Sequence, residues 1–190
     1  MWRWTAAHPD WAPGAEPGSP AEWPQLVGSV AYAAPDGFLL VDPLVPDDLW
    51  ADLRALVDAH GRPVKVFTTL KWHRRSRDEL VARLGARAVR SAAELPAGAE
   101  PLRIPRAGET MIWLTGPRAL VPGDRLLGDG AGGLRLCPPG WLRYLSPGLS
   151  QDELRAALRP LLDLPVELVL VSHGDPVLRN GRPALGRLLS

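Results

Sequence analysis

Three side chains that could carry out chemistry together are His73, Asp124 and His173, each placed directly after a short apolar run. Such runs predict β-strands, and active sites of layered α/β folds collect in the loops at strand ends. Imidazole and carboxylate groups are ligands that suit zinc and iron, and they also act as general acids and bases. The pattern therefore predicts a metal site or an acid–base site, provided that the three loops meet in space.

The elements that must position these residues follow from the hydrophobic pattern. Apolar runs predict strands over residues 1–5, 27–33, 37–41, 64–69, 86–89, 102–104, 110–114, 119–121 and 166–171. Helical spacing predicts a helix from about residue 47 that Gly61 ends, and capping boxes at 76–79 and 150–153 predict two more. A last short helix is predicted from Pro183. Strands mixed with helices in this order predict an α/β layered architecture without a second domain.

The composition narrows the class of protein. The chain has 190 residues, of which 46% are hydrophobic and 23% charged, as in an ordinary soluble domain. Its 22 basic and 21 acidic side chains leave a net charge of +1, which argues against nucleic acid as a partner despite the arginines between residues 74 and 90. The single cysteine, Cys137, excludes an internal disulfide framework. With no membrane-spanning run and no predicted signal peptide, we expect a cytoplasmic protein.

The order of the pieces resembles the metallo-β-lactamase-fold superfamily of metallo-hydrolases. The resemblance rests on the order and spacing of five segments, residues 38–43, 69–76, 108–110, 121–127 and 171–176. They are similar to the family's Asp-terminated strand, its HxHxDH metal-binding loop, the segment after its middle histidine, the strand of its bridging aspartate and the strand of its last histidine. The resemblance implies a single domain over residues 1–190, a four-layer αββα sandwich of two mixed β-sheets flanked by helices, with a dinuclear metal site between the sheets.

The chain departs from the family's ligand pattern in its HxHxDH-like loop. When the motif is laid on this loop, its first histidine falls on Lys71 and its second on His73. The aspartate of the motif falls on Arg75, and its last histidine falls on Ser76. The family's middle histidine, expected shortly before Gly108, has no counterpart. A degenerate motif of this kind predicts a depleted metal site.

By this resemblance three ligand positions remain filled, by His73, Asp124 and His173. Neither of the family's two metal sites then has the three protein ligands that a catalytic zinc usually has. One ion between the two half-sites could gather all three residues after some rearrangement. The cations of Lys71 and Arg75 stand where ligands would be and would repel a divalent ion. We therefore expect zinc or iron to be absent or sub-stoichiometric.

Two functions from different classes remain open. The first is a hydrolase in which one zinc or iron ion polarises a small-molecule substrate and activates a water molecule. The second is a non-catalytic relative, a pseudoenzyme, in which Lys71, His73 and Arg75 bind a small anionic ligand with Trp72 beside them, or in which these basic residues pair with Asp124. Metal-free acid–base hydrolysis by His73 and Asp124 is a third option. Homo-oligomerisation stays open, and no membrane partner is expected.

The three candidate residues also have purely structural explanations. Asp124 follows a glycine, and aspartates in turns bond to their own backbone. His173 precedes Gly174 and could end its strand, and His73 could be a loop histidine stacked near Trp72. Only the meeting of the three residues in one cavity separates the functional interpretation from these.

Two other polar residues, Ser76 and Asp42, are assigned structural roles, and Cys137 is placed in a loop. Ser76 is predicted to cap the helix that follows it, and Asp42 is predicted to orient its loop rather than to react. Cys137 lies within residues 128–140, a stretch rich in glycine and proline that predicts an exposed loop. No catalytic dyad around this cysteine follows from the sequence.

Overall fold

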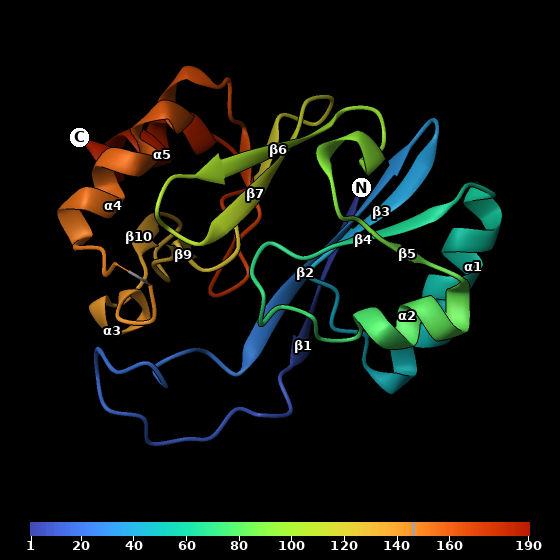
Figure 1. Cartoon of the computed structure of the whole chain (residues 1–190), viewed down its shortest axis with the longest axis horizontal. Coiled ribbons are helices and arrows are strands. Elements are labelled where there is room, and N and C mark those ends of the chain that lie inside the picture. The colour runs from blue at the N-terminus through green and yellow to red at the C-terminus, as the bar shows by residue number, and fades with distance from the viewer. Residues whose placement is uncertain (146) are drawn as a thin grey trace.

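Five strands form the first β-sheet of the protein (Figure 1). The computed structural model describes residues 1–145 and 147–190. In sheet order the strands are β1 (Trp2–Ala7), β2 (Leu26–Ala34), β3 (Gly37–Val41), β4 (Val64–Phe67) and β5 (Arg87–Ala88). β1, β2 and β3 pair antiparallel, with a short turn between β2 and β3. β3, β4 and β5 pair in parallel, because a helix lies between each successive pair of these strands.

A second sheet of four strands lies against the first. Its order is β11 (Leu168–Val169), β8 (Ala119–Val121), β7 (Glu109–Leu114) and β6 (Ala99–Ile104). β6, β7 and β8 pair antiparallel, and β11 pairs in parallel with β8. A separate two-stranded hairpin follows β8 and consists of β9 (Leu126–Gly128) and β10 (Leu134–Leu136).

Helices cover the outer face of each sheet (Figure 1). The α-helices are α1 (Trp50–His60), α2 (Arg77–Leu84), α3 (Pro139–Leu142), α4 (Gln151–Leu158) and α5 (Gly181–Leu189). Short 3₁₀ helices occur at η1 (Asp47–Leu49), η2 (Ala92–Glu94) and η3 (Arg159–Asp163). Gly61 ends α1 in the left-handed conformation, as its position in the sequence predicts. Ser150 and Glu153 form the predicted capping box of α4.

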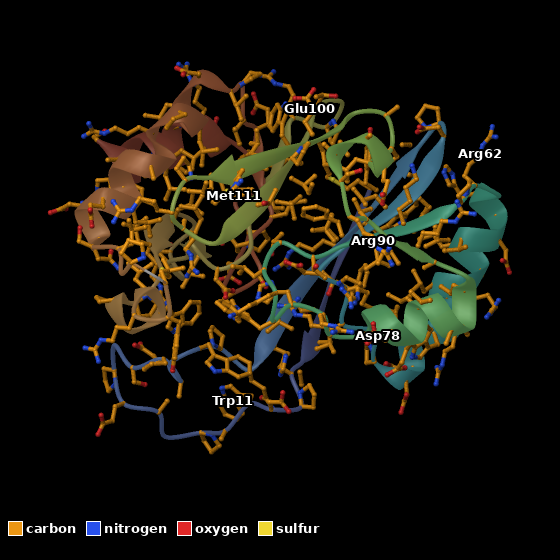
Figure 2. All side chains as sticks on the ribbon, in the orientation of Figure 1. Trp11, Arg62, Asp78, Arg90, Glu100 and Met111 are labelled. Carbon is orange, nitrogen blue, oxygen red and sulfur yellow. The ribbon has the colours of Figure 1, made fainter. Side chains whose placement is uncertain are left out.

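Alternation along single strands creates the layers. Leu39 and Val41 of β3 point between the sheets, where they share one core cluster with Ile112 and Leu114 of β7. Their neighbours Phe38 and Leu40 point the other way, into a cluster with buried residues of α1 and α2. Because successive side chains of a strand face opposite sides, each sheet joins two cores. Side chains fill the space between the layers (Figure 2).

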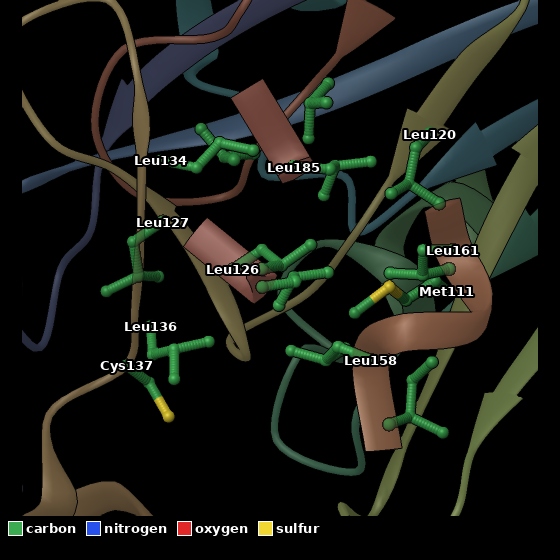
Figure 3. Close-up of a cluster of buried hydrophobic side chains, with 14 of the residues drawn as sticks. Met111, Leu120, Leu126, Leu127, Leu134, Leu136, Cys137, Leu158, Leu161 and Leu185 are labelled. Carbon is green, nitrogen blue, oxygen red and sulfur yellow. The ribbon is translucent and has the colours of Figure 1, made fainter. Parts of the chain in front are cut away.

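The third core lies on the outer face of the second sheet. Met111 and Leu120 pack there with Leu158 of α4 and Leu185 of α5 (Figure 3). Helices, sheet, sheet and helices therefore form four layers, and the expected αββα sandwich is confirmed.

Three local predictions differ from the structure. Residues 128–140 are not simply an exposed loop, since β9 and β10 form a hairpin and Cys137 behind it is buried. Ser76 precedes α2 but does not cap it, because its hydroxyl instead accepts a hydrogen bond from the backbone N–H of Val45 at 2.9 Å. The strand predicted over residues 166–171 is regular only at Leu168–Val169. For Ser76, a contact distant in sequence replaces the local cap.

Across the described ranges, no helix has the length and apolar character needed to cross a lipid bilayer.

The packing between the sheets predicts a large effect of truncation at Leu39. This side chain is fully buried, so Leu39→Ala leaves a cavity, and we expect the free energy of unfolding to fall by about 2–5 kcal/mol. Leu178, which is 66% exposed, provides the matched control, and Leu178→Ala should change stability by less than about 0.5 kcal/mol. Urea denaturation of both variants measures the difference, and equal effects would contradict the assigned core.

Candidate functional site

One cavity of about 510 Å³ lies beyond the carboxyl ends of three strands. It is lined by His73 from the loop after β4, Asp124 from the loop after β8 and His173 from the segment after β11. Aromatic side chains form much of the remaining wall, namely Trp23, Trp72, Trp141 and Tyr144. The structure thus brings the three residues singled out in the sequence into one cavity.

The two histidines meet on a single oxygen of Asp124. His73 Nε2 lies 2.9 Å from Asp124 Oδ1, and His173 Nε2 lies 3.3 Å from the same atom. All three side chains are buried. Although both nitrogens are close, no described residue gives this Oδ1 a well-aligned hydrogen bond. Two imidazole nitrogens and one carboxylate oxygen therefore converge without well-aligned hydrogen bonds between them. This is the arrangement expected of ligand atoms around a shared metal ion.

Asp42 fixes the orientation of His73. The Nδ1–H of His73 donates to Asp42 Oδ2 at 2.8 Å, so the opposite ring nitrogen is directed at Asp124. Asp42 also accepts hydrogen bonds from the backbone N–H of Thr69, at 2.8 Å, and from the Thr69 hydroxyl. Asp42 thus ties the end of β3 to the loop after β4 and holds the imidazole of His73, and the sequence indicated neither contact.

Trp72 sets the rotation of the Asp124 carboxylate. Its indole Nε1–H donates to Asp124 Oδ2 at 2.9 Å, which leaves Oδ1 for the two histidines. The ring of Trp72 is 43% exposed at the mouth of the cavity. A residue predicted to contact a ligand therefore also positions one of the three central side chains.

Glu109 holds the backbone on which Asp124 sits. Its carboxylate accepts N–H donors from three consecutive residues, at 3.0 Å from Gly123, 2.8 Å from Asp124 and 2.9 Å from Arg125. Burial raises the pKa of Glu109 to about 7, against the opposing effect of the Arg125 charge and the backbone donors. Sequence reasoning missed this residue. The only signal was a carboxylate at the start of an otherwise apolar strand.

Neither Arg75 nor Lys71 forms the ion pair with Asp124 that the sequence analysis left open. The guanidinium of Arg75 donates to the carbonyl oxygens of Gly28 and Asp42, at 2.8 and 2.7 Å, and to the Ser172 hydroxyl at 2.6 Å. Lys71 is exposed, with Nζ 5.3 Å from the centre of the Trp72 ring. Both residues line the cavity, but the contacts to the Asp124 carboxylate come from the histidines and Trp72.

Burial and neighbouring charges shift the pKa values of the three central residues. Burial disfavours protonated His73, but the carboxylates of Asp124 and Asp42 outweigh this effect and raise its pKa to about 9. Burial also works against ionised Asp124, yet the charge of His73 and contact with His173 hold the pKa of this carboxyl well below its usual range. Burial lowers the pKa of His173. Its ring lies edge-on to Trp141, with 5.4 Å between ring centres.

The three central residues fit one metal ion. Their ligand atoms lie within 4.8 Å of one another. Ligands at about 2.0–2.1 Å around a tetrahedral zinc are about 3.3 Å apart, near the 2.9 and 3.3 Å separations between the Asp124 oxygen and the histidine nitrogens. The bond from His73 to Asp42 is the carboxylate–histidine pairing that orients metal-bound imidazoles. The group could therefore hold a metal ion.

Comparison with solved structures identifies the fold that carries this site. No family model and no curated protein matches the chain. Among solved structures, TTHA1623 in a di-iron-bound form has a TM-score of 0.60 and 21% identity, over 85% of this chain and 92% of that one. A metallo-β-lactamase from Hirschia baltica has a TM-score of 0.59 and 14% identity, over 98% and 90% of the two chains. The chain has the metallo-β-lactamase fold.

A third example of the metallo-β-lactamase fold is the metallo-β-lactamase from Pontibacter korlensis, with a TM-score of 0.54 and 16% identity over 86% of this chain and 87% of that one. In the present chain, His73, Asp124 and His173 are the single group of three or more His, Cys, Asp or Glu residues with ligand geometry within residues 1–145 and 147–190. The metallo-β-lactamase fold thus carries one candidate metal site in the described part of the chain.

The contacts of Glu109 predict that it stabilises the loop carrying Asp124. In Glu109→Gln an amide N–H₂ replaces an oxygen that accepts backbone N–H groups, so we expect the free energy of unfolding to fall by about 1–3 kcal/mol. Glu100 on β6 is exposed and serves as the control, since Glu100→Gln should leave stability nearly unchanged. Urea denaturation in the presence of a chelator measures both. Equal stability of the two variants would contradict the role given to Glu109.

The position of His73 between two carboxylates predicts that the metal-free protein loses stability as the pH rises. A pKa raised from 6.5 to about 9 means that the folded state binds this proton more tightly than the unfolded chain. The resulting stabilisation is complete below pH 6.5 and disappears as the pH passes through about 9.

Urea unfolding with a chelator at about pH 6 and about pH 9.5 should differ by up to about 3 kcal/mol in the wild type. The difference should be smaller in His73→Gln, which retains every other titrating group. The same pH dependence in both proteins would contradict the assignment.

Proposed function

We propose that the protein is a hydrolase that uses a single metal ion held by His73, Asp124 and His173. The observation that carries this proposal is the convergence of three buried ligand atoms within 4.8 Å at the wall of a cavity. Three protein ligands with an open position are typical of catalytic zinc sites, and the same donor types also suit iron. TTHA1623 binds two irons in the similar structure, whereas the donors of this chain favour one ion.

When bound, zinc or iron would supply a Lewis acid that polarises a carbonyl or phosphoryl oxygen and lowers the pKa of a water molecule. The chain's own residues orient the metal ligands and contact the substrate. Asp42 keeps the Nδ1 proton on His73, so that Nε2 is the atom offered to the site. Trp72 turns Asp124 so that one oxygen faces the cavity. The exposed ammonium of Lys71 at the cavity mouth provides a contact for an anionic group of a small-molecule substrate.

Metal stoichiometry tests the proposal directly. Untagged protein supplemented with zinc or iron(II) and then desalted should retain about one equivalent by elemental analysis. His173→Ala removes one of three ligands and should weaken zinc affinity by at least about tenfold. His60→Asn is the matched control, because His60 lies at the end of α1 outside the cavity and contacts the carbonyl of Ala34. Retention below about a tenth of an equivalent by the wild type would refute the proposal.

Activity provides a second measurement on the same variants. Chromogenic esters of a carboxylic acid and of phosphoric acid sample the two substrate classes that such a site could hydrolyse. Activity of the zinc- or iron-loaded wild type should fall by at least about a hundredfold in His173→Ala and remain in His60→Asn. Activity that survives both chelation and His173→Ala would contradict a metal-dependent reaction.

The alternative is a non-catalytic relative that binds a small anion. Its support is the placement of His73 between Asp42 and Asp124, at 2.8 and 2.9 Å, because a protonated imidazole there balances the buried charge without an ion. In that case Lys71 and Trp72 at the cavity mouth would form the ligand contact, while Arg75 is held by protein acceptors. Absence of retained metal together with saturable binding of a carboxylate, weakened by Lys71→Met, would favour this alternative.

A further inference from the structure

The five-stranded sheet has two free edges of opposite character. One is β5, which is only two residues long, carries the exposed cation Arg87 and is followed closely by the exposed cation Arg90. Very short strands and charged side chains are the usual means by which proteins block edge-to-edge pairing. The other edge is β1, Trp2–Ala7, which is six residues long (Figure 1). Only the β5 edge carries such protection.

The hydrogen bonds of β2 show which groups of β1 face outward. Gly28 is the register partner of Thr5, yet the N–H of Gly28 donates to Ser172 O, on the side away from β1. The pair between Thr5 and Gly28 is therefore a non-hydrogen-bonded pair, and the N–H and C=O of Thr5 point to the open edge. By alternation Arg3 and Ala7 do the same. No backbone partner for these outward groups occurs within the described residues.

The side chains along this edge leave it open to a partner. The guanidinium of Arg3 turns inward and donates to the carbonyl of Val171, so it does not project a charge along the edge. Thr5 and Ala7 are exposed and uncharged. Trp2 at the start of the strand is 44% exposed, and Leu26 on the neighbouring strand is 54% exposed. The edge thus combines unpaired backbone groups with apolar surface, which favours strand addition.

We propose that β1 pairs antiparallel with β1 of a second copy of this chain, in a register centred on Thr5. A two-fold axis makes this edge self-complementary, because each outward residue then meets an outward residue of the other copy. Arg3 lies opposite Ala7 of the second copy, and Thr5 lies opposite Thr5. Trp4 lies opposite the small side chain of Ala6. The register avoids facing arginines and facing tryptophans and provides about six backbone hydrogen bonds.

The pair joins two five-stranded sheets into one continuous sheet. Its contact area is smaller than that of an obligate dimer, so we expect a reversible equilibrium with a Kd on the order of 1–100 μM. The interface borders the cavity, since Ala7 leads directly into the loop whose His8 and Trp23 line it. The inference does not depend on metal, because β1 contributes no ligand to the candidate site.

Sedimentation velocity of the wild type between about 1 and about 200 μM should show a shift from monomer to dimer. Thr5→Pro removes the outward N–H without removing a bond between β1 and β2, and its ring blocks pairing, so the Kd should rise at least about tenfold. Thr5→Val keeps the N–H and should dimerise like the wild type. Ala88→Pro on β5 should also leave dimerisation unchanged. A wild type that stays monomeric, or dimers that Thr5→Pro leaves intact, would overturn the proposal.

Hydrogen exchange on the wild type keeps the test informative if Thr5→Pro fails to fold. The amides of Arg3, Thr5 and Ala7 should become more protected as the protein concentration rises, because they pair only in the dimer. The amides of Trp4 and Ala6 already bond to β2 and should change far less. Concentration-dependent protection at β5 instead of β1, or at neither edge, would refute pairing through β1.

Discussion

The carboxylate of Asp124 is the group on which the rest of the site depends. A buried carboxylate is tolerated only where positive charge and hydrogen-bond donors surround it, since its desolvation is costly. Here His73 and His173 approach one oxygen and the indole of Trp72 binds the other. These residues come from the loop after β4 and the segment after β11. The site therefore forms only when the two sheets are packed against each other.

A second constraint is backbone strain at the end of β3 and in the loop after β4. Asp42 and Arg75 both have positive φ angles, of 46° and 40°, which cost about 1–3 kcal/mol each in residues other than glycine. Arg75 offsets this cost by linking the carbonyls of Gly28 and Asp42 to the Ser172 hydroxyl. By resemblance it occupies the position of a metal-binding aspartate. In this chain that position carries a cation that ties three segments together.

Much of the local structure could be predicted because it depends on neighbouring residues. Gly61 ends α1 because only glycine readily adopts the left-handed conformation required there. Ser150 caps α4 because its partner Glu153 lies within the same turn. The apolar runs of β2, β3, β7 and β8 predict strands close to those found, because a short apolar run bounded by turn residues is typical of a strand buried on both faces. Their order, through its resemblance to a known superfamily, also predicts the four-layer sandwich.

The sequence by itself determined most strands, although not β9 and β10, together with most helix ends and the three residues offered to the site, His73, Asp124 and His173. Only the tertiary structure decided which partners those residues have. Ser76 shows why, since its hydroxyl chooses a backbone N–H 31 positions away over the local cap. Glu109 likewise reaches three N–H groups beyond the next turn and strand. A polar side chain bonds to the nearest donor in space, and that distance is set by how the sheets pack, which no local pattern encodes.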